Sequence, residues 1–238
     1  MRITMADEKE RLLALLKDNK ISKDDYQLLL AAIDKKPSRL VQFFFFAINP
    51  FHKIAGWLAL SIGILILLAI SYLGVIAKFY YPSVLSSLDA LVVKNPKVPL
   101  NFFLLAYQNF VIWLLLTVIF FLVAKILKQR GIRAVDFFGT VALSRFPTLV
   151  YTAISAIVWL VYPAVMYVDI NQGYPIHQTT AMALMDVFYA VCSVWQLAIY
   201  FFAFKVSSGL VGKKLYLSFI FSILLAETIS TLVTSIFI

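Results

Sequence analysis

The sequence has few of the residues that carry chemistry in enzymes. Cys192 is the only cysteine, so no disulfide can form within one chain. His52 and His177 are the only histidines, and the topology predicted below puts them on opposite sides of a membrane. This excludes a histidine-based metal site within one chain. No phosphate-binding loop, dinucleotide fingerprint or nucleophile elbow occurs. We therefore expect a protein that is not an enzyme and has no cofactor or metal.

Charged residues are also scarce, and they are unevenly distributed. They make up 14% of the chain, against roughly a quarter in soluble domains, while 62% of the residues are hydrophobic. Residues 1–39 hold nine Lys/Arg and seven Asp/Glu, whereas residues 40–238 hold twelve and five. The net charge of +9 does not predict nucleic-acid binding, because the basic residues beyond the first forty lie in short loops beside apolar segments. Membrane topology accounts for that placement.

Five apolar segments are long enough to cross a bilayer, which takes about twenty residues. They are Ile54–Ile76, Phe102–Ala124, Thr148–Val168, Leu184–Phe204 and Leu215–Phe237. The fold class is therefore predicted to be all-α, a bundle of five transmembrane helices. Pro82, Pro96 and Pro99 bracket a short helix, Val84–Val93, in the loop between the first two spans.

The distribution of Lys and Arg in the loops predicts the orientation. The second loop holds Lys125, Lys128, Arg130 and Arg133, and the fourth holds Lys205, Lys213 and Lys214. The third loop, Asp169–Ala183, holds none, whereas the first contains Lys78, Lys94 and Lys97 and weakens the contrast. The first forty residues are hydrophilic and do not form a secretory signal. We expect the N-terminus in the cytoplasm and the C-terminus on the far side of a bacterial inner membrane.

The hydrophilic N-terminal segment is predicted to be a cytoplasmic two-helix hairpin, residues 1–38. Its helices are expected at Ala6–Asp18 and Lys23–Lys35, with Ser22 and Asp25 placed as in a capping box. A core this small is not stable alone, so residues 1–36 should pack on a second copy in a homo-oligomer, on the membrane domain or on a partner. The pattern LLKDNKISKDDYQLLLAAI resembles SHOCT-like helical hairpins.

Residues 39–53 connect the hairpin to the membrane domain, residues 54–238. Phe43 to Phe46, flanked by Arg39 and Lys53, suit a segment at the lipid interface. A simple linker with an aromatic anchor explains the same pattern.

Ionisable side chains within the spans are candidates for an intramembrane polar site, because a bilayer makes them costly. Glu227 lies near the middle of the last span. Beside it small residues recur every four positions and form a helix-packing ridge: Ser218, Ser222, Ala226, Ser230 and Thr234. Glu227 is either a proton, cation or substrate site or a buried carboxyl that fixes the register of the helix.

Arg145 and a seam on the fourth span complete the candidate site. Arg145 precedes Pro147 and has three interpretations: snorkelling to a lipid phosphate, pairing with Asp136, or meeting Glu227. Snorkelling is the simplest. The seam consists of Asp186, Tyr189, Ser193, Gln196 and Tyr200, at helical spacing. It serves either helix packing or a path for a solute.

The run Asp136-Phe137-Phe138-Gly139 through Ala142-Leu143-Ser144-Arg145-Phe146-Pro147 resembles the motif of the Yip1 family. The five spans, the small cytoplasmic head and the far-side C-terminus are similar to that family too. The resemblance implies a non-enzymatic polytopic protein that works through partners, with Asp136, Gly139 and Pro147 as structural positions. Arg145 departs from the family's apolar step before the proline.

Two functions follow as hypotheses. The first is a non-catalytic Yip1-like scaffold or adaptor that associates with other membrane proteins or shapes the membrane, with residues 1–36 as its docking module. The alternative is a transport component, either a permease subunit or a small-solute or proton-coupled carrier, that uses Glu227, Arg145 and the seam.

Overall fold

The computed structural model describes residues 5–18, 21–34, 38–79, 81, 83–84, 100–127, 131–161 and 180–234. These residues form two compact units, Met1–Ala47 and Ile48–Ile238. Every regular element in the described ranges is a helix, so the predicted all-α class is confirmed. Within the described ranges, the first unit holds two whole helices and most of a third, and the other helices lie in the second unit.

The first unit contains α1 (Met5–Lys17), α2 (Lys23–Asp34) and most of α3 (Arg39–Ile48). Helices α1 and α2 pack against each other. The amide of Asp25 donates to Ser22 Oγ (3.0 Å), and the Ser22 hydroxyl donates to the Asp25 carboxylate (2.7 Å). This reciprocal contact caps the N-terminus of α2 through Ser22 and Asp25, the two residues predicted to do so. No residue of α3 is buried, and its phenylalanines are exposed.

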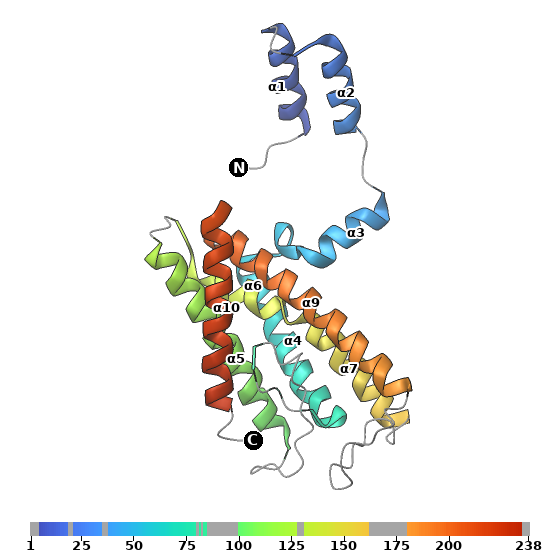
Figure 1. Cartoon of the computed structure of the whole chain (residues 1–238), viewed down its shortest axis with the longest axis vertical. Coiled ribbons are helices and arrows are strands. Elements are labelled where there is room, and N and C mark those ends of the chain that lie inside the picture. The colour runs from blue at the N-terminus through green and yellow to red at the C-terminus, as the bar shows by residue number, and fades with distance from the viewer. Residues whose placement is uncertain are drawn as a thin grey trace. The chain divides into compact units, whose positions relative to one another are not determined.

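The second unit contains five helical stretches that are long and apolar enough to span a membrane. They are α4 (Gly56–Ala77), α5 (Phe102–Ile126), the stretch Ala134–Val161 formed by α6 (Ala134–Leu143) and α7 (Phe146–Val161), α9 (Thr180–Ser208) and α10 (Gly212–Thr234). A 3₁₀ turn, η1 (Pro50–His52), precedes α4. The chain is an integral membrane protein by this criterion. Successive stretches run in opposite directions (Figure 1).

The third stretch begins earlier than the sequence indicated. The expected start was Thr148, but α6 already lies inside the bundle and buries Phe137 and Val141 completely. The helix is interrupted at Ser144 and Arg145, and α7 begins at Phe146. Pro147 cannot donate to a carbonyl in the preceding turn but is tolerated in the first turn of a new helix. The proline therefore explains the break without ending the span.

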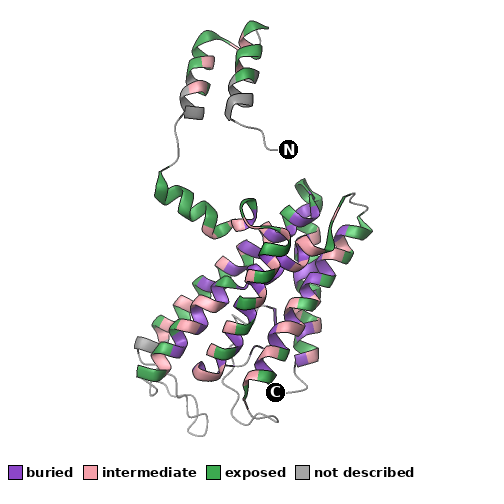
Figure 2. Cartoon of the chain, turned by 180° about the vertical axis from the view of Figure 1, so that it is seen from behind, coloured by how far each residue is buried: buried purple, intermediate pink, exposed green. Residues whose placement is uncertain are grey.

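Burial is arranged for lipid rather than for water. The outward sides of the spans carry exposed Trp57, Leu65, Phe103 and Leu160, while polar side chains are buried inside the unit. Buried residues run along the faces that the helices turn toward one another (Figure 2). Hydrocarbon contacts such an apolar exterior without cost, and polar groups find their partners inside. This inverted arrangement agrees with the membrane assignment.

Glycines bring α4 and α6 into close contact. A Cβ at Gly139 would lie 2.7 Å from the carbonyl oxygen of Gly56 and 2.9 Å from the amide nitrogen of Leu60. A Cβ at Gly63 would lie 2.9 Å from backbone atoms of Ala142 and Leu143. Only residues without a side chain allow helices to approach this closely. The contact fixes α6, and with it the break at Arg145, against α4.

Some sequence expectations fall on residues outside the described ranges. They are the helix at Val84–Val93, the end of the third span at Val168, the end of the last span at Phe237, and the cations Lys94, Lys97, Lys128 and Arg130. His177 also lies outside them.

Candidate functional site

The candidate site is a polar interior centred on Arg145. This side chain is completely buried at the break between α6 and α7. One terminal nitrogen of its guanidinium donates to Asn109 Oδ1 (2.9 Å). The other lies 3.5 Å from both the Val84 carbonyl and the Tyr200 hydroxyl. Arg145 thus connects the break to α5, to α9 and to the segment that follows α4.

Two interpretations of Arg145 from the sequence were wrong. Snorkelling would leave the guanidinium near water, but its exposed fraction is 0%. Pairing with Asp136 fails because the two Asp136 oxygens accept instead from Arg133, at 2.9 and 3.0 Å. Helix α6 is embedded in the bundle rather than lying at its edge, and this carries Arg145 into the interior. Its hydrogen-bond acceptors within the described residues are all neutral oxygens.

Beyond α4 the chain turns back into the bundle. Lys78 ends α4 in the left-handed conformation (φ 59°), and its amide and that of Phe79 return to the Gly74 carbonyl. Phe79 and Tyr81 are then buried, with the Phe79 ring stacked on Tyr151 at 5.5 Å. Non-helical backbone is tolerated at membrane depth only where protein or water satisfies it. We refer to the described residues 79, 81, 83 and 84 as the re-entrant segment.

Side chains of three spans satisfy the re-entrant segment. The Tyr81 amide donates to Gln108 Oε1 (3.2 Å), and the Tyr81 hydroxyl bonds to Thr152 Oγ1 (2.9 Å). The Val84 amide donates to Ser230 Oγ (3.2 Å), and its carbonyl faces Arg145. Polar side chains of α5, α7 and α10, together with Arg145, thus hold a stretch of non-helical backbone.

The seam on α9 joins this interior at its inner end. Gln196 Nε2 donates to the Tyr200 hydroxyl (2.8 Å), and the Thr148 hydroxyl donates to Gln196 Oε1. Ser193 is buried as well, and its hydroxyl donates to the Tyr189 carbonyl. Asp186 is exposed. The structure therefore brings Gln196 and Arg145 together through Tyr200, whereas Asp186 lies at the opposite end of the seam.

Sequence reasoning missed Gln108 and Asn109. Both are completely buried, and Asn109 Nδ2 donates to Ser71 Oγ of α4 (3.2 Å) while its oxygen accepts from Arg145. They are the only amide side chains in α5, and they are adjacent in sequence. That signal was visible, because amides inside an apolar span are rare and are placed toward other helices. The course of the re-entrant segment had no comparable signal.

Several buried polar atoms of this interior have no hydrogen-bond partner within the described part of the chain. They are Arg145 Nε, Gln108 Nε2, Ser83 Oγ and Ser155 Oγ. Buried polar groups are normally satisfied, so each such group calls for an explanation. Ser83 belongs to the re-entrant segment, and Gln108 and Arg145 both form hydrogen bonds with it. The fourth, Ser155, follows Thr152 by one helical turn.

Helix α10 packs through the ridge expected from its small residues. Ser222, Ala226, Ser230 and Thr234 are buried and Ser218 is exposed to a greater degree, whereas Leu224 and Leu232 face outward. Glu227 is half-buried beside this ridge, and its backbone carbonyl accepts from Ser230 and Thr231. Ser230 in turn accepts from the Val84 amide. Glu227 therefore lies one turn from a residue that holds the re-entrant segment.

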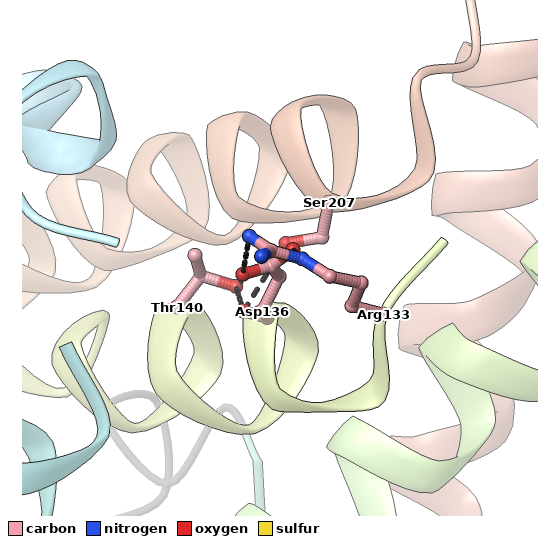
Figure 3. A network of polar contacts seen from close by, with 4 residues as sticks. All are labelled: Arg133, Asp136, Thr140 and Ser207. Carbon is pink, nitrogen blue, oxygen red and sulfur yellow. Dashed lines mark hydrogen bonds and ion pairs between the residues drawn. The ribbon is translucent and has the colours of Figure 1, made fainter. Parts of the chain in front are cut away.

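A second polar cluster joins α6 to the end of α9 (Figure 3). The Thr140 hydroxyl bonds to Ser207 Oγ (2.9 Å), and both hydroxyls lie within reach of the Asp136 carbonyl oxygen, at 2.7 and 3.3 Å. The Asp136 side chain, in the first turn of α6, pairs with Arg133. A carboxylate in this position also interacts favourably with the helix dipole. The cluster ties two spans together at the end of the bundle opposite Lys78.

The fold and this interior define a polytopic, all-α integral membrane protein. Within the described residues no group of three or more His, Cys, Asp or Glu side chains could hold a metal ion. Comparison with known protein families, with curated proteins and with solved structures gave no match.

Proposed function

We propose that the chain is a transport component, a carrier or permease subunit that binds a small solute in the polar interior around Arg145. The observation that carries the proposal is the complete burial of an arginine at a helix break, next to non-helical backbone. Ionisable groups within membrane spans are costly and commonly mark solute or ion pathways. Interrupted helices near the midplane are also where carriers bind their substrates.

The depth of Arg145 supports this function. It follows Ala134 by eleven residues and precedes Val161 by sixteen, which corresponds to roughly 16 and 24 Å along the helices at about 1.5 Å per residue. Arg145 therefore lies far from both ends of the stretch that the structure describes. Helix packing alone does not need a charge there, because hydroxyls and amides hold helices together at lower cost.

The expected orientation is part of the proposal. The ends of the spans at the start of α4 and the end of α5 carry Lys53 and Lys125, and the start of α10 carries Lys213 and Lys214. Lys78 lies at the other end. This bias favours a cytoplasmic N-terminus and a far-side C-terminus in a bacterial inner membrane.

Water access to the interior tests the transport function. In a Cys192→Ala background, Ser155→Cys places a thiol at a buried hydroxyl that has no partner in the described structure. A membrane-impermeant thiol reagent should label it in proteoliposomes, because a solute path must admit water. Lys213→Cys is the positive control, and Ile157→Cys, whose side chain is 61% exposed on the outer surface, is the lipid-facing negative control. Labelling of Ser155→Cys no faster than of Ile157→Cys would contradict the transport function.

A second candidate function is the Yip1-like scaffold or adaptor, and a different observation favours it. The unit Met1–Ala47 is compact by itself, and Leu13 and Leu29 of its hairpin are each 43% exposed. Exposed leucines on a small hairpin suit a docking surface. Leu13→Lys and Leu29→Lys should then abolish capture of a partner, whereas Glu10→Gln should not. Unchanged partners after deletion of residues 1–36 would contradict the docking role.

A further inference from the structure

We propose that the interior around Arg145 binds a small oxyanion, a dissolved molecule that carries a carboxylate or phosphate group. Arg145 is the residue that recognises it. The proposal rests on the transport function proposed above and names the class of its solute. It depends on three observations: the charge of Arg145, the unused hydrogen-bonding capacity of its guanidinium, and its depth in the membrane.

The first observation concerns charge. Arginine keeps its positive charge under all ordinary conditions, and burying a charge without a counter-charge is costly. The acceptors of Arg145 in the described part of the chain are the Asn109 amide oxygen, the Tyr200 hydroxyl and the Val84 carbonyl. Two of these contacts measure 3.5 Å, at the limit of hydrogen bonding. An anion at this position would supply the negative charge that these dipoles lack.

The second observation concerns unused hydrogen-bonding capacity. Arg145 Nε and Gln108 Nε2 are buried nitrogens without a partner within the described residues, and both can only donate. Gln108 also holds the Tyr81 amide through its oxygen, and Ser83, whose Oγ is likewise unsatisfied, precedes the Val84 carbonyl that faces Arg145. A guanidinium edge that includes Nε matches the two oxygens of a carboxylate or phosphate group. The unused donors and the missing counter-charge thus call for the same ligand chemistry.

The third observation is the distance of Arg145 from the end of its span, which favours a solute as the source of the anion. Lipid phosphates lie at the bilayer interface, about 15 Å or more from the midplane of a hydrocarbon core about 30 Å thick. Arg145 lies roughly 16 Å along the helix axis from Ala134, the nearer end of its span. The guanidinium is also completely buried in protein. A lipid headgroup would have to leave the interface to reach it, so the ligand is a solute that enters the interior.

The test measures the thermal stability of the full-length protein in detergent with potassium phosphate or potassium acetate, against potassium chloride at equal ionic strength. A ligand that binds only the folded state raises the Tm with concentration, by about 3–6 °C for a chain of this size at a tenfold excess over Kd. Arg145→Gln should abolish the shift. Asn109→Asp should also abolish the shift while keeping the arginine, because the new carboxylate would pair with the guanidinium and supply its counter-charge. Arg133→Gln, which removes a surface arginine, should keep the shift.

The outcomes separate this proposal from the transport function. A shift in the wild type that is lost in Arg145→Gln and Asn109→Asp supports the oxyanion. An equal shift in all variants indicates adventitious ion binding only and overturns it, as does the absence of a shift with either anion. If Ser155→Cys is labelled from water while neither anion binds, the proposed solute class is wrong but the water-accessible path of the transport function is still supported. If Ser155→Cys is not labelled, the transport function itself fails.

Discussion

The guanidinium of Arg145 donates a 2.9 Å hydrogen bond to the side-chain carbonyl of Asn109, and the amide of Asn109 donates in turn to Ser71. Three spans are connected by these two contacts: the interrupted third span, α5 and α4. All three side chains are completely buried. Asn109 is therefore the closest partner of the buried charge and the link between it and the first span.

Replacement of Asn109 by leucine should destabilise the protein strongly. Asn109→Leu would remove the shortest hydrogen bond of a buried cation and leave Ser71 Oγ without this donor, at a cost of about 3 kcal/mol in the free energy of unfolding. Reversible unfolding in mixed detergent measures the change. Leu114→Ala, on the exposed face of the same helix, is the control and should cost much less. A difference below about 1 kcal/mol between Asn109→Leu and wild type would indicate that Arg145 does not depend on Asn109.

The close contact of α4 and α6 gives a second prediction. Gly139→Leu would force a side chain against the backbone of Gly56 and Leu60, and should lower the free energy of unfolding by roughly 1–3 kcal/mol or more. Ala134→Leu, at an exposed position on the same helix, should have little effect. Equal stability of the two variants would show that α4 and α6 do not approach as closely as described.

The cluster of Figure 3 should be only weakly stabilising. The side chain of Arg133 is 70% exposed, so Asp136→Asn should cost less than about 1 kcal/mol, and the effect should shrink as salt is added. Thr140→Val removes a buried contact to Ser207 and should cost about 0.6–1 kcal/mol independently of salt. The salt dependence of the unfolding free energy distinguishes the two. A salt-independent loss in Asp136→Asn would contradict the assignment of its role to the ion pair.

The orientation is tested with single cysteines in the Cys192→Ala background. Lys125→Cys and Lys213→Cys should react with an impermeant thiol reagent from the same side, because two spans lie between them. Lys78→Cys should react from the opposite side, because one span separates it from Lys125. Labelling of intact and opened spheroplasts measures the side. Reaction of Lys125→Cys and Lys213→Cys from different sides would contradict the five-span topology.

The number of spans was predictable from the sequence because it depends on the length and hydropathy of each segment alone. The start of the third span was not. The residues before Thr148, which include Asp136 and Arg145, lie outside the span predicted from the sequence, but glycine contacts with α4 bury most of them, and such contacts depend on tertiary packing.

Only part of the candidate site was predictable from the sequence. Gln196 and Arg145 are rare polar residues in apolar spans, and this made them visible. Their connection runs through Tyr200 and through the re-entrant segment. No local pattern in the sequence predicts that the re-entrant segment returns into the bundle, because its partners lie on three other helices.

The substitution Asn109→Asp tests most directly whether Arg145 is a buried cation without a carboxylate partner. Its new carboxylate would replace the amide oxygen 2.9 Å from the guanidinium and form a charge-assisted hydrogen bond. We expect the free energy of unfolding of Asn109→Asp to equal or exceed that of wild type, and Arg145→Gln to remove this gain. A free energy of unfolding as low as that of Asn109→Leu would contradict this expectation, because a second buried charge would then have found no partner.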